Sequence, residues 1–212
     1  TPLETLFPYT TLFRSQAWTS DDTDAVERLK IQYGSSYCYP ISSMGSHVSV
    51  CPNHQLNRNT PLYTRANVAY FGTFGYELDL NKLTEEEQEE VKDQIRFMKQ
   101  YRELFQFGTF YRLRDPFQHN VAAWMVVSED KKEAIVGWYR VLNVVNEAFH
   151  RLALKGLDPD LCYSSSADGR SYYGDELMNA GLITSDASAG EVTPEETPSC
   201  DFDSRLYILK AE

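Results

Sequence analysis

Apolar residues recur with the period of an α-helix most clearly over residues 85–105. Val91, Ile95 and Met98 follow one another at spacings of three or four residues, which places their side chains on one side of a helix. Thr84 stands at the N-cap position, and a glutamate follows three residues later, which is the spacing of a capping box. The pattern therefore predicts a long amphipathic helix that begins directly after Thr84.

Shorter strands and helices are predicted to alternate in the first half of the chain. Residues 44–50 alternate between apolar and polar positions, as a strand does, and residues 72–80 form a second strand-like run that opens on a glycine. Helices are expected over residues 24–33, where Asp24 begins a second capping-box spacing, and over residues 60–69, where a proline takes the first helical position. Strands that alternate with helices at this spacing predict βαβ units and a parallel sheet.

The pattern changes after residue 106, where short β-rich runs follow and no further helix is predicted. The expected strands are residues 107–113, 121–127, 133–141, 148–154 and 204–210. Residues 129–132 form a turn that joins two of these strands into a hairpin. Residues 184–200 contain few large apolar side chains and are expected to form a mobile loop. This half is predicted to be an antiparallel β-sandwich.

The first fifteen residues stand apart from this pattern. Residues 1–15 repeat the tripeptide TLF and follow neither the period of a strand nor that of a helix, so we interpret them as a foreign or artefactual segment. The rest of the chain divides into an α/β part, residues 16–106, and an all-β part, residues 107–212. The fold class expected from the residues is therefore α/β plus all-β.

Composition and charge exclude several classes of function. The 212 residues include 31 acidic and 20 basic side chains, and the resulting net charge of −11 argues against a nucleic-acid partner. No run of about 18 apolar residues occurs, so no membrane segment is expected. The four cysteines form no CxxC pair and no disulfide framework, and no signal peptide is recognisable. These features favour a reducing, cytoplasmic location.

The densest group of reactive side chains is WTSDDTDA, residues 18–25. Asp21, Asp22 and Asp24 lie where a strand passes into a helix, and the C-terminal ends of parallel strands are where functional sites are built. Carboxylates before a helix are also ordinary N-caps. Trp18 favours a sugar ligand, because indole rings stack on sugar faces and glycosidases flank the bond they cleave with carboxyl groups. From spacing alone, capping and catalysis both remain open.

His47, Cys51 and His54 are residue types that bind metals, but their H-x3-C-x2-H spacing matches no standard zinc pattern. We interpret them as polar residues of a strand and of the loop after it. A glycine-rich phosphate loop is also missing from the strand–helix junctions. No metal and no cofactor is therefore expected.

Trp124, Trp138 and Tyr139 form an aromatic cluster in the β-rich half. Exposed rings would make a sugar platform, whereas buried rings would belong to the core of a sandwich. The apolar runs around these residues favour the core.

Five sequence segments together carry a family resemblance. They are, in chain order, WTSDDTDAVERLKIQYGSSYCYP, MGSHVSVCPNHQ, TPLYTRANVAYFGTFGYELDL, GDELMNAGL and DFDSRLYILKAE. From about residue 16 to residue 212, the chain resembles the C-terminal part of the glycoside hydrolase family 36 α-galactosidases. The resemblance implies that residues 16–106 are the last βα units of a (β/α)8 TIM barrel and that residues 107–212 are the family's C-terminal β-sandwich domain.

The resemblance also implies a reaction. Enzymes of this family hydrolyse terminal α-galactosyl groups of raffinose-type oligosaccharides and retain the configuration at the sugar carbon. The first aspartate of the family's WTSD pattern is the general acid/base, here Asp21, and the tryptophan that opens the pattern lines the galactose pocket, here Trp18. Asp22 and Asp24 receive no catalytic role and are expected at the helix start. The partners implied are α-galactoside oligosaccharides and, for the parent enzyme, further copies of itself in a homo-oligomer.

A retaining glycosidase needs a second carboxyl group as its nucleophile. In this family the nucleophile lies in a K-W-D pattern on an earlier strand, and neither that pattern nor the family's Cys-Gly-rich segment occurs here. The resemblance therefore implies a chain that carries the acid/base and is inactive by itself. Two alternatives stay open: a raffinose-synthase-like galactosyl transferase and a non-catalytic carbohydrate-binding β-sandwich module.

Overall fold

The computed structural model describes four stretches of the chain: residues 16–144, 150–166, 168–184 and 201–212. The segment 1–15, interpreted as foreign, lies outside the described residues, and so does the predicted mobile loop apart from its first residue, Thr184. No helix within these four stretches is both long enough and apolar enough to cross a membrane.

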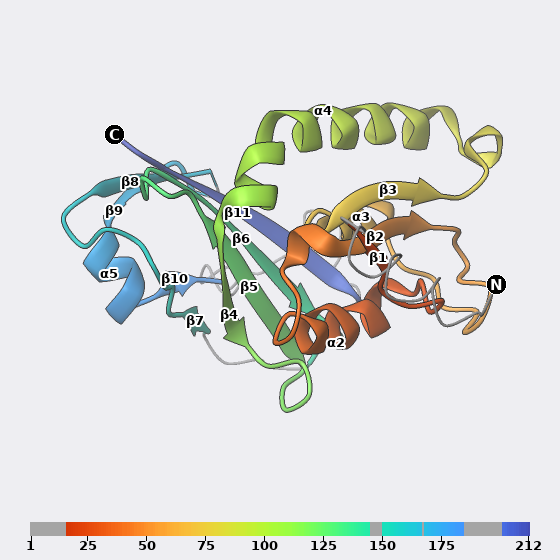
Figure 1. Ribbon diagram of the computed structural model, residues 1–212, viewed down its shortest axis with the longest axis horizontal. Helices are drawn as coiled ribbons and strands as arrows, with labels where there is room; N and C mark the ends of the chain where they lie inside the picture. Colours follow the sequence, from red (N-terminus) through yellow and green to blue (C-terminus); the bar gives the residue numbers. More distant parts are fainter. Residues whose placement is uncertain (1–15, 145–149, 167, 185–200) are drawn as a thin grey trace, which may run out of the picture.

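Three parallel strands form the first sheet, as the alternation of strands and helices predicts. The strands β1 (Ala17–Trp18), β2 (Met44–Ser49) and β3 (Thr73–Glu77) lie side by side in this order (Figure 1). The helices that follow them are α2 (Ala25–Ser35), α3 (Leu62–Ala69) and α4 (Glu85–Phe107). Two 3-10 helices lie in the connections, η2 (Ile41–Ser43) and η3 (Leu80–Lys82).

Single polar residues determine where these helices begin. The Thr84 hydroxyl accepts the N–H of Glu87 and the Glu87 carboxylate accepts the N–H of Thr84, so the predicted capping box of α4 is confirmed. Asp24 caps α2, but its predicted capping box is only half present, because the Asp24 N–H donates to the carboxylate of Asp22 instead. Pro61 is the N-cap of α3 rather than its first helical residue.

A six-stranded antiparallel sheet forms most of the second half. Its strands, in spatial order, are β4 (Thr109–Arg114), β5 (Val121–Val127), β6 (Glu133–Arg140), β11 (Asp203–Ala211), β8 (Cys162–Ser165) and β9 (Ser171–Tyr173). A separate antiparallel pair consists of β7 (Arg151–Leu152) and β10 (Leu182–Ile183). One expectation was wrong: α5 (Gly174–Asn179) is a helix in the half where none was predicted. Its six residues are too few to show a helical period.

Both faces of the six-stranded sheet are buried. On β5, Trp124 and Val126 point to one face, and Met125 and Val127 point to the other, because successive side chains of a strand alternate. The first face packs against the α/β part, including Phe71. The second face packs against leucines of β7, β10, α5 and the segments between them. Within the described residues, the layer opposite the large sheet on this side is therefore a two-stranded sheet and a short helix.

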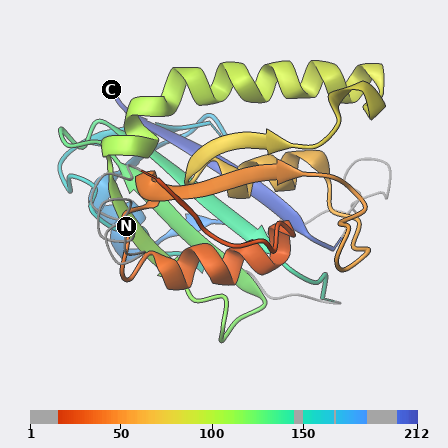
Figure 2. The ribbon, with the colours of Figure 1, turned by 45° about the vertical axis from the view of Figure 1, so that its right-hand side comes forward.

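Helix α3 joins the two halves, because it lies between the first sheet and β11 (Figure 2). The hydroxyl oxygens of Thr64 and Ser204 are 2.9 Å apart, and the Asn67 side-chain amide donates to the Ser204 hydroxyl at 2.9 Å. The Tyr139 hydroxyl donates to the Asn67 carbonyl at 2.7 Å. These bonds fix the parallel sheet, and with it the segment after β1, relative to the antiparallel sheet.

Candidate functional site

The structure places Asp21 in the short loop between β1 and α2, at the C-terminal end of a parallel strand. The Asp21 side chain is exposed, and no hydrogen bond or ion pair with the described residues holds its carboxylate. Trp18 is the last residue of β1, and 49% of it is exposed. Both predicted site residues therefore lie at the edge of the sheet where ligands of parallel sheets bind.

One buried arginine of α2 holds the loop that carries Asp21. Arg28 Nε donates to the carbonyl of Asp22 at 2.6 Å, Nη2 donates to the carbonyl of Ser20 at 2.6 Å, and Nη1 donates to the carbonyl of Gly45 at 3.1 Å. Burial lowers the pKa of Arg28, whereas nearby carboxylates raise it, foremost that of Asp22. The backbone on both sides of Asp21 is thus fixed, while its side chain is free to meet a ligand.

Structural contacts occupy the two neighbouring aspartates. Asp22 Oδ1 accepts the N–H of Asp24 at 3.0 Å. Asp24 is buried, accepts the N–H groups of Val26 and Glu27 at 3.0 Å each, and forms an ion pair with Arg58. The prediction that Asp22 and Asp24 belong to the helix start is confirmed.

The Trp18 indole stacks on the imidazole of His47 in β2. The ring centroids are 4.6 Å apart, and the planes meet at 29°. His47 Nδ1 is buried and has no hydrogen-bond partner among the described residues. Burial lowers the pKa of His47, the carboxylate of Glu77 raises it, and Arg28 lowers it. The neutral imidazole is therefore the form that stacks on Trp18 at neutral pH.

Sequence reasoning missed the parts that Arg28 and His47 play at this site. His47 was interpreted as a polar strand residue, and Arg28 was not singled out. The signal that could have pointed to His47 is a glycine at each neighbouring position on its face of the sheet, Gly45 on its own strand and Gly75 on β3. No comparable local signal exists for Arg28, because its acceptors are backbone carbonyl groups.

The other groups singled out from the sequence lie elsewhere. In the described part of the chain, His, Cys, Asp and Glu side chains do not gather in groups of three that could hold a metal ion. Trp124, Trp138 and Tyr139 are at most 3% exposed, and Trp138 points to the face of the sheet opposite the other two. The interpretation of these rings as core is confirmed, and the sugar-platform alternative is wrong for them.

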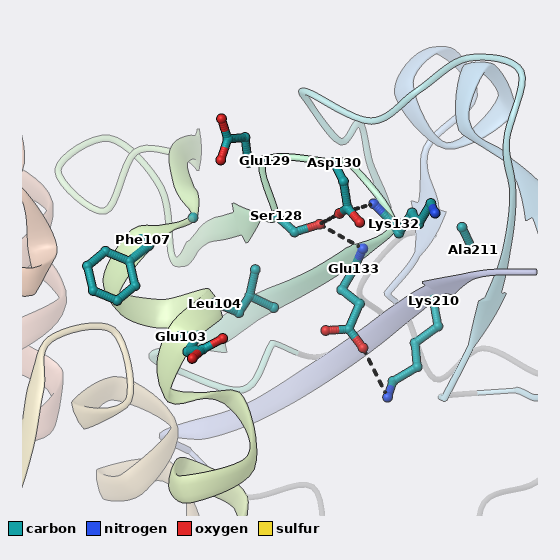
Figure 3. A pocket seen from close by; sticks show the side chains of 11 residues that line it. Glu103, Leu104, Phe107, Ser128, Glu129, Asp130, Lys132, Glu133, Lys210 and Ala211 are labelled. Carbon is teal, nitrogen blue, oxygen red and sulfur yellow. Dashed lines mark hydrogen bonds and ion pairs between the residues drawn. The ribbon is translucent and has the colours of Figure 1, made fainter.

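A depression of about 540 Å³ lies between the end of α4 and the turn that joins β5 to β6 (Figure 3). Two contacts link polar groups of its lining: Lys210 Nζ lies 3.2 Å from Glu133 Oε1, and the Ser128 hydroxyl donates to Asp130 Oδ1 at 2.7 Å. Neither Trp18 nor any of the three aspartates around it lines this depression. The candidate site and this depression are therefore separate features.

Two protein-family models match the chain: Melibiase over residues 9–108, and Glycosyl hydrolase family 36 C-terminal domain over residues 121–209. Alpha-galactosidase AgaA of Geobacillus stearothermophilus is 51% identical over 199 residues, and Alpha-galactosidase Mel36A of Lactobacillus acidophilus is 43% identical over 199 residues. Each match covers 94% of this chain and 26% of the relative. The chain thus spans about a quarter of the length of these curated relatives.

The comparison with solved structures agrees with the matches to family models and curated relatives. The GH36 α-galactosidase AgaB of Geobacillus stearothermophilus superposes with a TM-score of 0.85 at 52% identity, over 93% of this chain and 26% of that one. A variant of AgaA from the same organism, crystallised in complex with raffinose, superposes with a TM-score of 0.84 at 50% identity over the same shares. The likeness therefore extends over both halves of the described structure.

Proposed function

The chain belongs to glycoside hydrolase family 36, and from this premise we propose that it forms the C-terminal part of a retaining α-galactosidase. The substrates would be oligosaccharides with terminal α-galactosyl groups, of the raffinose type. The observation that carries the proposal is the fixed loop after β1, which presents the exposed carboxylate of Asp21 shortly after the half-exposed indole of Trp18 in the chain. Crystallised variants of the relative AgaA in complex with raffinose and with stachyose support this substrate class.

In this proposal Asp21 is the general acid/base. Its carboxyl group protonates the glycosidic oxygen as the bond breaks and then takes a proton from the water that releases the sugar. The contacts of Arg28 support this role, because they hold the carbonyl groups of Ser20 and Asp22 and leave the Asp21 side chain unused.

Trp18 lines the galactose pocket in the same proposal. An indole face stacks on the C–H groups of a sugar ring, and the exposed half of Trp18 is available for that contact. Trp18 and Asp21 would therefore touch the same galactosyl group, one through its ring face and the other through its carboxyl oxygen.

The nucleophile of the proposed enzyme lies outside these 212 residues, which contain no K-W-D pattern. A retaining mechanism needs two carboxyl groups about 5–5.5 Å apart, one on each face of the sugar carbon. Removal of a nucleophile lowers kcat by many orders of magnitude. We therefore propose that the chain alone does not hydrolyse α-galactosides.

The same proposal includes the barrel and sandwich assignment of the two halves and the cellular location of the parent enzyme. Residues 16–106 would supply the last βα units of a (β/α)8 barrel, and residues 107–212 would form the β-sandwich domain that follows it. The parallel order of β1, β2 and β3 and the antiparallel sheet after α4 support this division. A cytoplasmic homo-oligomer is the proposed state of the parent enzyme, to be tested by cell fractionation and light scattering.

The proposal is tested in an assembled enzyme, in which residues 16–212 replace the matching C-terminal part of AgaA. This enzyme should release free galactose from raffinose, whereas the chain alone should not. Asp21→Asn should lower kcat by about 10²–10⁴-fold, the usual contribution of a general acid. The matched control is Asp160→Asn, an exposed aspartate of the other half, which should leave kcat unchanged. An inactive assembled enzyme, or full activity of Asp21→Asn, would contradict the proposal.

A further inference from the structure

Side chains of β2 point alternately toward the helices and toward the opposite face of the sheet. Met44 is buried in the core that the helices share, and the Ser46 hydroxyl donates to the side chain of Gln32 in α2 at 3.0 Å. His47 follows Ser46 and therefore points to the opposite face. There it meets Trp18 of the neighbouring strand.

One glycine of β3, Gly75, makes room for the imidazole, and a second glycine, Gly45, lies beside it. The strand register sets Gly45 opposite Trp18 and Gly75 opposite His47. A Cβ atom at Gly75 would lie 2.7 Å from His47 Cδ2 and 3.1 Å from His47 Nε2, and a Cβ atom at Gly45 would lie 3.5 Å from His47 Cε1. Because Gly75 lacks a side chain, the imidazole lies over it, whereas a Cβ atom at Gly45 would meet His47 only at an ordinary contact distance. The stack thus depends on all three parallel strands.

We propose that His47 is a positioning residue, which holds the Trp18 indole at the angle at which it receives the galactosyl group. The inference rests on the proposed function, in which Trp18 lines the galactose pocket. The imidazole stacks on the indole with ring centroids 4.6 Å apart, so the tilt of the indole plane follows the imidazole. A stacked aromatic pair is worth roughly a two- to tenfold change in an equilibrium constant. Loss of His47 therefore weakens sugar binding rather than proton transfer.

Steady-state kinetics of the assembled enzyme with raffinose test this role. His47→Ala should raise KM by about two- to tenfold and change kcat much less, because the lost contact favours the bound substrate and the transition state alike. Gly75→Ala should raise KM in the same direction with His47 intact, since its new methyl group displaces the imidazole. The control His119→Ala, an exposed histidine beyond β4, should leave KM unchanged.

Tryptophan emission of the unmodified chain provides a second readout, because a protonated imidazole quenches an indole that it touches. Emission should fall in one step as His47 takes up a proton, and the step should vanish in His47→Ala and in Trp18→Phe.

An unchanged KM in both His47→Ala and Gly75→Ala, or an emission step that survives in His47→Ala, would overturn the inference. If the assembled enzyme is inactive while the emission step is present, the proposed function fails and the pocket role of His47 fails with it. Activity with an unchanged KM overturns only the role of His47.

Discussion

Asp21 is positioned through its backbone rather than through contacts of its own side chain. Arg28 donates to the carbonyl groups of Ser20 and Asp22, which precede and follow it in the chain. A third bond from Arg28 reaches Gly45 and ties this loop to β2. In the proposed function Asp21 is a general acid, a role that needs a fixed location and a carboxyl group without structural contacts of its own.

Arg28→Met should lower the free energy of unfolding of the chain by about 3 kcal/mol. The substitution keeps an unbranched side chain but removes three hydrogen bonds from a charged donor, including those to the carbonyl groups of Ser20 and Asp22. Urea unfolding measures the change. Lys30→Met, at an exposed position of the same helix, is the matched control and should change the value by less than about 0.5 kcal/mol. Equal effects of the two substitutions would contradict the assigned role of Arg28.

The lowered pKa of His47 predicts a pH dependence of stability with a definite sign. In the unfolded chain the pKa of His47 is about 6.5, and in the folded chain burial lowers this pKa. Between the two values the unfolded chain binds more protons, so the free energy of unfolding falls as the pH drops through about 6.5 toward the folded value.

Urea midpoints between about pH 7.5 and about pH 5.5 measure this slope. His47→Gln should flatten the slope, because glutamine does not titrate. An identical slope in the variant would show that His47 does not contribute to it.

At the scale of the elements, the sequence predicted most local features and missed the distant contacts. The apolar spacing of α4 and the capping box at Thr84 lie within a few turns of helix, and both were predicted correctly. The half-formed capping box at Asp24 was not, because the carboxylate of Asp22, two residues earlier, competes with Glu27 for the Asp24 N–H. The stack of His47 on Trp18 joins two strands separated by a whole helix, and no periodicity predicts such a contact.

Asp24→Ala should destabilise the chain by about 2–3 kcal/mol, because it removes the cap of α2 and leaves Arg58 without its buried partner. Asp24→Asn should cost less, since the amide oxygen still accepts the two N–H groups. Thr84→Ala, which removes an exposed and uncharged cap from α4, should cost about 1 kcal/mol. Thermal or urea unfolding of the three variants ranks them by their loss of unfolding free energy. A smaller loss of unfolding free energy for Asp24→Ala than for Thr84→Ala would refute the predicted order.

At the scale of the whole molecule, one core unites the two halves. Phe71 of the α/β half contacts Trp124 of the antiparallel sheet with ring centroids 5.8 Å apart, and Phe105 packs edge-on against Phe71. The antiparallel sheet therefore supports the parallel sheet that carries Trp18 on β1 and Asp21 in the loop after it. Since the chain spans about a quarter of its relatives' length, the proposed reaction also depends on a nucleophile supplied from outside it.

The leaving-group dependence of Asp21→Ala in the assembled enzyme tests the central claim most directly. A general acid is essential for the sugar leaving group of raffinose and nearly dispensable for an acidic phenol such as dinitrophenol. Raffinose hydrolysis should therefore fall by about 10³-fold, while cleavage of the dinitrophenyl α-galactoside should persist and added azide should yield the α-configured galactosyl azide. Equal losses on both substrates, or unchanged raffinose hydrolysis, would contradict the assignment of Asp21 as the acid/base.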